Sequence, residues 1–267
     1  GTNNTAVGGY AMQANTTGYD NTSIGELALV TNTTGWCNVS VGISALNSNT
    51  TGNHNTSIGR NAMYTNQQGD RNTAVGSDAL YTMNPSGDVD TFNTAIGYHA
   101  QYATTTGIKN TAVGAYTLDA NTTGDKNAGF GYAALSSATT GEGNTALGFA
   151  SLHANTTADY NTAVGYQSLD ANTTGSGNTV VGMDASKAAT TASYNVVIGQ
   201  NSGISITTGS HNTLVGRSSG EDITTAASNV CIGYDAAHSL TTGENNVCLG
   251  KMAGSYVYAL TDGTRNV

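Results

Sequence analysis

Paired carboxylates are the first side chains in this sequence that could do chemistry. Hydrolysis of a glycosidic bond needs two of them about 5 to 9.5 Å apart. Asp119 and Asp170 hold equivalent places in a repeating sequence but lie three repeats apart, about 14 Å if successive repeats stack as neighbouring strands. Asp88 and Asp90 are closer, in a segment that we expect to be a flexible, solvated loop, with calcium or glycan contact as the alternative.

Histidine and cysteine are too dispersed for a metal centre. No H-x-H pair occurs, and Cys231 and Cys248 fall at the same place in successive repeats, about 4.8 Å apart if these stack. That distance permits a disulfide. Because Val and Leu hold this place just upstream, we expect two buried free thiols instead, and Cys37 at a corner. The histidines lie in separate repeats: His54, His99, His153, His211 and His238.

Tyrosine is the most suggestive surface residue, since an aromatic face beside Asn and Asp suits sugar binding. Three tyrosines, Tyr64, Tyr81 and Tyr102, share one place in the repeat. Packing between neighbouring repeats or chains explains the tyrosines equally well. Four more share a variable place, and together with two acids of the loop they are our candidate glycan-binding residues: Tyr98, Tyr132, Tyr166, Tyr234, Asp88 and Asp90.

The composition excludes several classes of protein. With a formal net charge of -9, the chain should not be drawn to nucleic acid or to anionic membrane surfaces. It has no apolar run of about 18 residues, so no membrane insertion is expected. It has 35 Gly, three Phe and one Trp, too few large side chains for an ordinary core. No nucleophile elbow, phosphate-binding loop or calcium repeat is present, so we expect no enzyme and no cofactor.

The order in the chain comes from a 17-residue repeat. Numbered from its Asn, each repeat has an apolar residue at position 4, Gly at position 5, a small residue at position 8 and usually Thr-Thr-Gly at positions 13 to 15. The spacing changes only twice, to 21 residues after Asn72 and to 20 before Asn266. Fifteen whole repeats begin at Asn4, Asn21, Asn38, Asn55, Asn72, Asn93, Asn110, Asn127, Asn144, Asn161, Asn178, Asn195, Asn212, Asn229 and Asn246.

Each repeat predicts one coil of an all-β, parallel β-solenoid. Seventeen residues are too few for a pair of helices or a propeller blade, and dense Gly, Thr, Asn and Ser disfavour helix. In residues 161–177 we predict a strand at "NTAVG", a bend at the Gly, a second short strand at "YQSL" and a return turn at "NTTGSG". Equivalent residues of stacked coils form ladders, so the position 1 asparagines should hydrogen-bond to one another.

Two departures divide the sequence. We expect regular coils over residues 1–177, with a loop inserted near 82–92 that holds the only Pro. The solenoid should continue over residues 178–267 with altered core ladders. There position 9 changes from mostly Leu or Met to Ser, Gly or Ala, and position 3 from Ala or Ser to Val, Leu or Cys. The large side chains thus change from position 9 to position 3, and no linker separates the two regions.

Positions 3 and 4 are adjacent in the strand and point to opposite faces. Both are nonpolar or small, so we expect a strand buried on both sides. One side lines the coil, and we expect neighbouring chains to cover the other, with the small residues of position 3 close to a symmetry axis. Neither end of the sequence looks like a cap, so we also expect a segment of a longer polypeptide or filament.

The repeat "NTAVGYQSL...NTTG" resembles the 17-residue repeats of bacteriophage tail fibres and other phage structural proteins. It is more distantly similar to the heads of trimeric autotransporter adhesins. The resemblance covers essentially the whole chain. It implies a homotrimeric, left-handed parallel β-roll, extracellular or on a virion, that projects or forms an attachment surface.

These observations predict a structural fibre or adhesin segment on a virion or cell surface that mediates or supports attachment to host cells. Its expected partners are other copies of itself, as a homotrimer or a filament, and a cell-surface glycan. One alternative is the subunit of a bacterial extracellular filament. Another is an ice-binding β-solenoid, although adjacent Thr-Thr pairs send their hydroxyls to opposite faces, whereas T-x-T would place them on one.

Overall fold

The computed structural model describes residues 1–255 and is an all-β, parallel β-solenoid of about 14 turns with 17-residue spacing. The predicted all-β, parallel β-solenoid is thereby confirmed, and each of the fifteen repeats supplies one strand to the main sheet of its unit. Residues 256–267, which complete the last predicted repeat, lie outside the described part of the chain. The chain divides into two compact units, Gly1–Ala133 and Ala134–Val267, and each is described by itself. Within residues 1–255, no helix is long and apolar enough to cross a membrane.

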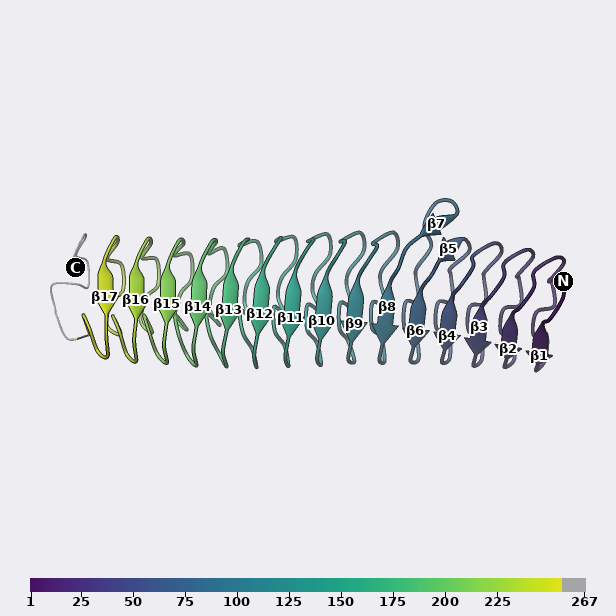
Figure 1. The fold of residues 1–267 in the computed structure, drawn as a ribbon, viewed down its shortest axis with the longest axis horizontal. Coiled ribbons are helices and arrows are strands. Elements are labelled where there is room, and N and C mark those ends of the chain that lie inside the picture. The colour runs from purple at the N-terminus through teal and green to yellow at the C-terminus, as the bar shows by residue number, and fades with distance from the viewer. Residues whose placement is uncertain (256–267) are drawn as a thin grey trace. The chain divides into compact units, whose positions relative to one another are not determined.

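The first unit has one main sheet and one small sheet (Figure 1). The small sheet pairs β5 (Gly69–Asp70) with β7 (Val89–Asp90). The main sheet contains three-residue strands that pair in parallel and in chain order: β1 (Thr5–Val7), β2 (Thr22–Ile24), β3 (Val39–Val41), β4 (Thr56–Ile58), β6 (Thr73–Val75), β8 (Thr94–Ile96), β9 (Thr111–Val113) and β10 (Ala128–Phe130).

The second unit has strands of the same length, which also pair in parallel and in chain order. Each strand again comprises positions 2 to 4 of its coil. The strands are β11 (Thr145–Leu147), β12 (Thr162–Val164), β13 (Thr179–Val181), β14 (Val196–Ile198), β15 (Thr213–Val215), β16 (Val230–Ile232) and β17 (Val247–Leu249).

Pairing is in register, so equivalent positions of adjacent coils lie side by side. Thr5 pairs with Thr22, one repeat further on. The four extra residues of the long repeat do not disturb this register, because Thr73 pairs with Thr94, 21 positions away. They project from the coil near β7, which pairs with β5 of the preceding repeat and whose residues Val89 and Asp90 are exposed.

The glycine at position 5 makes the corner that ends each strand. Gly42 has φ +130°, which side chains rarely adopt, and a Cβ there would lie 2.7 Å from the carbonyl of Gly59 in the next coil. The stacked corners approach too closely for any other residue. This explains why position 5 is always Gly.

The second strand that we predicted at "YQSL" is wrong, since that segment is a series of turns. Gln167 and Leu169 both have left-handed backbones, with φ +49° and +54°. Their peptide groups point in opposite directions along the stack: Gln167 N–H donates to Phe149 in the preceding coil, and Leu169 N–H donates to Ala185 in the following one. This side of the coil therefore bonds to its neighbours without extended geometry.

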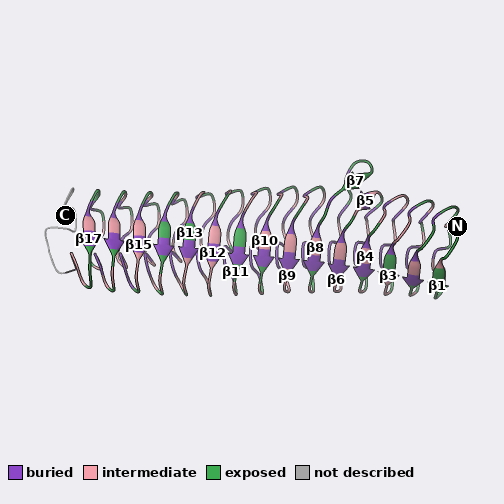
Figure 2. Ribbon diagram, viewed as in Figure 1, coloured by how far each residue is buried: buried purple, intermediate pink, exposed green. Residues whose placement is uncertain are grey.

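The core assignment of the strand faces was also wrong in part. Position 3 lines the coil interior, where Ala95 and Ala112 are fully buried, and it does not face a neighbouring chain. Position 4 points outward instead, and Ile24 and Ile96 remain 41% and 39% exposed. Figure 2 shows buried, half-buried and exposed residues following one another around the coils. The physical reason is volume: a large buried side chain at position 9, Gln101 in the coil of Ala95 and Leu118 in that of Ala112, occupies the interior, so only a small residue fits at position 3.

From Asn178 onward the interior is filled differently. Position 9 is Gly203 in one coil, and a Cβ there would lie 2.7 Å from Ile206 Cδ1 and 2.9 Å from Leu214 Cδ1. Ile206 at position 12 and Leu214 at position 3 are both fully buried. The bulk lost at position 9 is thus replaced from two ladders, and the contribution of position 12 was not predicted.

Candidate functional site

The position 1 asparagines form a continuous amide ladder within each unit. Asn38 donates from its backbone N–H and its Nδ2 to Asn21 Oδ1, at 2.9 and 3.2 Å, and from Nδ2 to the Gly52 carbonyl at 2.8 Å. Its own Oδ1 accepts from the Asn55 backbone N–H at 2.9 Å. Asn212 makes the same bonds in the second unit, to Asn195 and Ala226. All members from Asn21 to Asn246 are buried, whereas Asn4 is half-buried.

A second amide ladder, at position 12, was not predicted from the sequence. Asn49 Nδ2 donates to Asn32 Oδ1 at 2.8 Å and to the Gly52 carbonyl at 3.0 Å, and both asparagines are fully buried. The signal was visible as a recurring Asn before Thr-Thr-Gly. These Asn-Thr-Thr sequences have the form of glycosylation sites, but the buried amides are engaged in the ladder.

The inserted loop brings its two acids, Asp88 and Asp90, near Asp70 of the preceding repeat, and Asp90 pairs with Asp70 in register. Asp90 forms an exposed ion pair with Arg71, and the Gly87 N–H donates to Gln68 Oε1 at 2.9 Å. Burial raises the pKa of Asp70, and the Asp88 carboxylate adds to that rise. In the described part of the chain, no group of three or more His, Cys, Asp or Glu side chains could hold a metal ion.

Tyr98 and Tyr132 belong to one aromatic cluster of the first unit. Both meet Tyr116 edge to face, with ring centroids 5.4 and 5.8 Å apart. The cluster continues from Tyr98 through His99 to Tyr102, at 4.2 and 4.5 Å. Tyr81 lies stacked between Tyr64 and Tyr102, with centroids 5.2 Å apart on each side, so its faces are covered by its neighbours. Tyr98 and Tyr132 keep 45% and 51% of their surface exposed.

Tyr166 and Tyr234 have separate surroundings in the second unit. Tyr166 stacks on Phe149 with a centroid distance of 5.3 Å. Tyr234 is flanked by two cations, since Arg217 Cζ lies 5.7 Å and Lys251 Nζ 5.6 Å from its ring centroid. The structure therefore does not gather these two candidates into one site.

Asp119 and Asp170 each pair with a histidine and not with another carboxylate. Asp119 Oδ1 lies 3.6 Å from His99 Nδ1, and Asp170 Oδ1 lies 3.6 Å from His153 Nδ1. Burial raises the pKa of both aspartates, and the neighbouring histidine opposes that rise. Each contact joins a histidine of one coil to an aspartate of the next, and the Asp184 carboxylate adds to the rise at Asp170.

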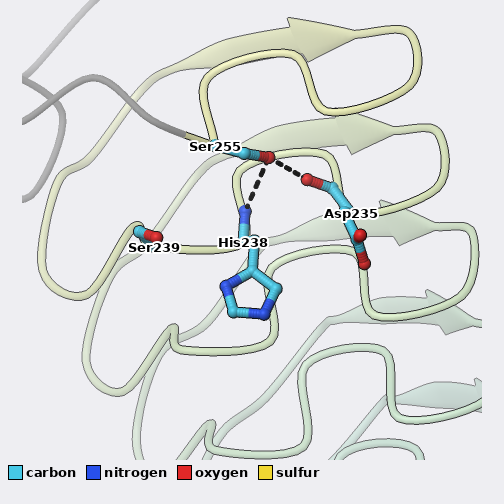
Figure 3. Close-up of a pocket in the computed structure, with 4 residues that line it drawn as sticks. All are labelled: Asp235, His238, Ser239 and Ser255. Carbon is cyan, nitrogen blue, oxygen red and sulfur yellow. Dashed lines mark hydrogen bonds between the residues drawn. The ribbon is translucent and has the colours of Figure 1, made fainter.

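A small pocket in the second unit is lined by Asp235, His238, Ser239 and Ser255 (Figure 3). These residue types could form a hydrolytic triad, but their hydrogen bonds are of another kind. The Ser255 hydroxyl donates to the Asp235 backbone carbonyl and accepts from the His238 backbone N–H. The His238 imidazole points away from Ser255, so it cannot activate that hydroxyl in this arrangement.

The two cysteines of the second unit are packing residues. Cys231 and Cys248 pair in register between β16 and β17, and both are free and buried, as expected. Burial raises the pKa of Cys231 to about 12. Such a thiol is almost entirely protonated at neutral pH and is a poor nucleophile. Cys37 is free and half-buried at a corner.

Each unit has an apolar stripe on the outer face of its strands. We call the position 4 residues the outer stripe, and position 2, mostly Thr, lies beside it. No charged residue occurs at position 2 or 4 in any coil. Its members are Val7, Ile24, Val41, Ile58, Val75, Ile96, Val113 and Phe130 in the first unit, and Leu147, Val164, Val181, Ile198, Val215, Ile232 and Leu249 in the second.

Comparison with protein-family models, with curated proteins and with solved structures found no match. The likeness to phage tail fibres therefore depends on the repeat alone. The structure itself shows a regular solenoid, and the outer stripe of each unit remains accessible in the single chain.

Proposed function

We propose that this chain is a structural fibre or adhesin segment whose copies associate through the outer stripe. On this proposal it projects from a virion or cell surface, in the extracellular space, and mediates or supports attachment to host cells. The observation that supports it is the outer stripe itself: an apolar residue in every coil that is exposed or half-buried, on a scaffold held by buried amide ladders. Contiguous apolar surface of this kind marks interaction sites.

A second copy of the chain is the partner that fits this surface best. The stripe has the same 17-residue period in every copy, so two copies can match coil for coil. It is uncharged, although the chain has a net charge of -9, so association there does not bring like charges into contact. Burying each Ile or Val of the stripe would contribute about 1 to 2 kcal/mol. A homotrimer in the form of a left-handed β-roll is the arrangement that the tail-fibre resemblance implies.

Molar mass in solution, measured by light scattering, tests this proposal. We expect three chains for the wild type and one chain for the double variant Ile24→Asp/Ile58→Asp, because two charges would be placed within the apolar contact. The matched control is Thr17→Asp/Thr34→Asp, which adds the same charge at exposed position 14 and should remain trimeric. A monomeric wild type would contradict the proposal, whereas long end-to-end polymers in electron micrographs would favour the bacterial filament.

One observation favours ice binding as a second candidate function. Thr at position 2 and Val or Ile at position 4 point to the same outer face, so the in-register sheet carries a regular T-x-V/I array. The Thr-Thr pairs at positions 13 and 14 do not supply it, because the position 13 hydroxyl bonds to the next coil, as from Thr33 to the Thr50 carbonyl. Thermal hysteresis by a monomeric wild type, lost in Ile24→Asp/Ile58→Asp, would establish this function in place of the first.

A further inference from the structure

The outer surface of the second unit is not uncharged everywhere. Beside the outer stripe, two cations flank one tyrosine: Arg217, Tyr234 and Lys251. They occupy position 6 of three successive coils, and all three are exposed. Arg217 approaches the Tyr234 ring from the coil before it and Lys251 from the coil after it, at 5.7 and 5.6 Å. We call this group the cation-tyrosine site.

The two cations are oriented by the ring and not by carboxylates. Within residues 1–255, neither Arg217 nor Lys251 lies within ion-pair distance of an acidic side chain, whereas Arg71 and Lys187 do. Attraction to the ring face holds a cation in place without consuming its N–H donors. In a chain with a net charge of -9, this leaves two positioned cations available to an external anion.

The spacing of the cations indicates the shape of that anion. Arg217 and Lys251 belong to coils two steps apart, which corresponds to about 10 Å along the stack. Guanidinium binds a carboxylate or sulfate with two parallel hydrogen bonds, ammonium binds it as a point charge, and the Tyr234 hydroxyl between them can bond to a sugar hydroxyl. A polymer with one anionic group per disaccharide presents charges in this way.

We propose that the cation-tyrosine site binds an acidic polysaccharide that lies along the stacked coils. The proposal rests on the attachment function above, since it names the chemistry of the surface to which the segment attaches. The site is local: position 6 of the three coils that begin at Asn144, Asn161 and Asn178 holds uncharged side chains instead, Phe149, Tyr166 and Met183.

The test is binding of the full chain to immobilised hyaluronate, with neutral dextran as the blank and sodium chloride varied. We expect salt-sensitive binding by the wild type, weakened about tenfold or more in Arg217→Gln/Lys251→Gln and a few-fold in Tyr234→Phe. Circular dichroism checks that the variants fold. The matched control is Lys109→Gln/Lys126→Gln, which removes two cations that share position 17 of successive coils in the first unit and should not change binding.

Three results would overturn the site: no binding to hyaluronate, equal weakening in both double variants, or equal binding of double-stranded DNA, which would indicate a general attraction to polyanions. Light scattering on the same samples separates this proposal from the first. A trimer that does not bind hyaluronate would contradict only the proposed binding site. A monomer that binds hyaluronate would contradict only the proposed association of chains.

Discussion

Two sets of coils in this chain share a backbone and differ in what fills them. The coil that begins at Asn38 has Ser40, Leu46 and Asn49 at positions 3, 9 and 12, whereas the coil that begins at Asn195 has Val197, Gly203 and Ile206 there. Position 9 keeps nearly the same left-handed backbone in both, with φ +47° at Leu46 and +54° at Gly203. Both coils therefore fill the same interior, but the large side chains that fill it come from different ladders.

The comparison also separates two kinds of amide ladder. Position 12 changes from Asn to Ile without loss of the coil, so its amides can be replaced by apolar packing. Position 1 remains Asn in every coil of both sets, because each member bonds the backbone of its own coil and of its neighbour. The position 1 ladder should thus matter equally in the two regions.

The largest expected effect is the loss of a position 1 amide. Asn38→Ala and Asn212→Ala should each lower the free energy of unfolding by about 4 kcal/mol, because several buried partners would lose their hydrogen bonds at once. Urea unfolding followed by circular dichroism measures this. Thr34→Ala, at exposed position 14, is the control and should change stability by less than about 0.5 kcal/mol. A much smaller loss in one region than in the other would break the equivalence of the two.

A smaller effect tests how the interior is shared. Leu46→Ala and Ile206→Ala should each cost about 3 kcal/mol, because each removes the main bulk of its coil. Adding bulk at the other position 9, as Gly203→Ala, should cost about 1 kcal/mol, since the new Cβ would press on Ile206. In the Ile206→Ala background that second cost should shrink to the part that comes from Leu214 Cδ1 and from the left-handed backbone of residue 203, which a double-mutant cycle can measure. Simple additivity would show that positions 9 and 12 do not share one space.

The amount that the sequence predicts depends on what the repeat can encode. The 17-residue period alone predicts which residues lie side by side, and the pairing of Thr5 with Thr22 confirms it. It could not reveal the left-handed backbones of Gln167 and Leu169, because such conformations usually call for Gly or Asn. The alternation of a strand shows that positions 3 and 4 face opposite ways, but it does not show which of them faces the interior. That depends on volume, because a Leu at position 9 leaves room only for a small residue such as Ala at position 3.

The candidate site was predictable to a different degree. The four position 6 tyrosines could be read from the sequence, but their surroundings could not, since a neighbouring coil contributes the contacts. Arg217 and Lys251 share position 6 with Tyr234 and could have been found by comparing adjacent repeats. That Tyr98 joins an aromatic cluster through Tyr116 depends on side chains at different positions, which the repeat does not align.

The smallest expected effect is a pH dependence shared by the two units. Burial raises the pKa of Asp119 and Asp170 above the ordinary value of 3.8, so the folded chain holds these protons more tightly than the unfolded chain. The stability that they contribute is complete below about pH 4 and is lost as pH rises through the raised pKa values. Asp119→Asn and Asp170→Asn should therefore gain stability relative to the wild type as pH rises from about 4 to 6. Thermal melts measure the difference, Glu244→Gln is the exposed control, and a loss of relative stability over that range would contradict the sign.

The in-register ladders have a mechanical consequence. A force that pulls on the two ends of a unit would act along the stack, in the direction of the bonds between coils. Because each coil is held only by its neighbours, coils would peel away singly, each releasing 17 residues, or about 58 Å of chain. The long repeat between Asn72 and Asn93 would release 21 residues, about 70 Å, and so would mark its own place in the extension of the first unit.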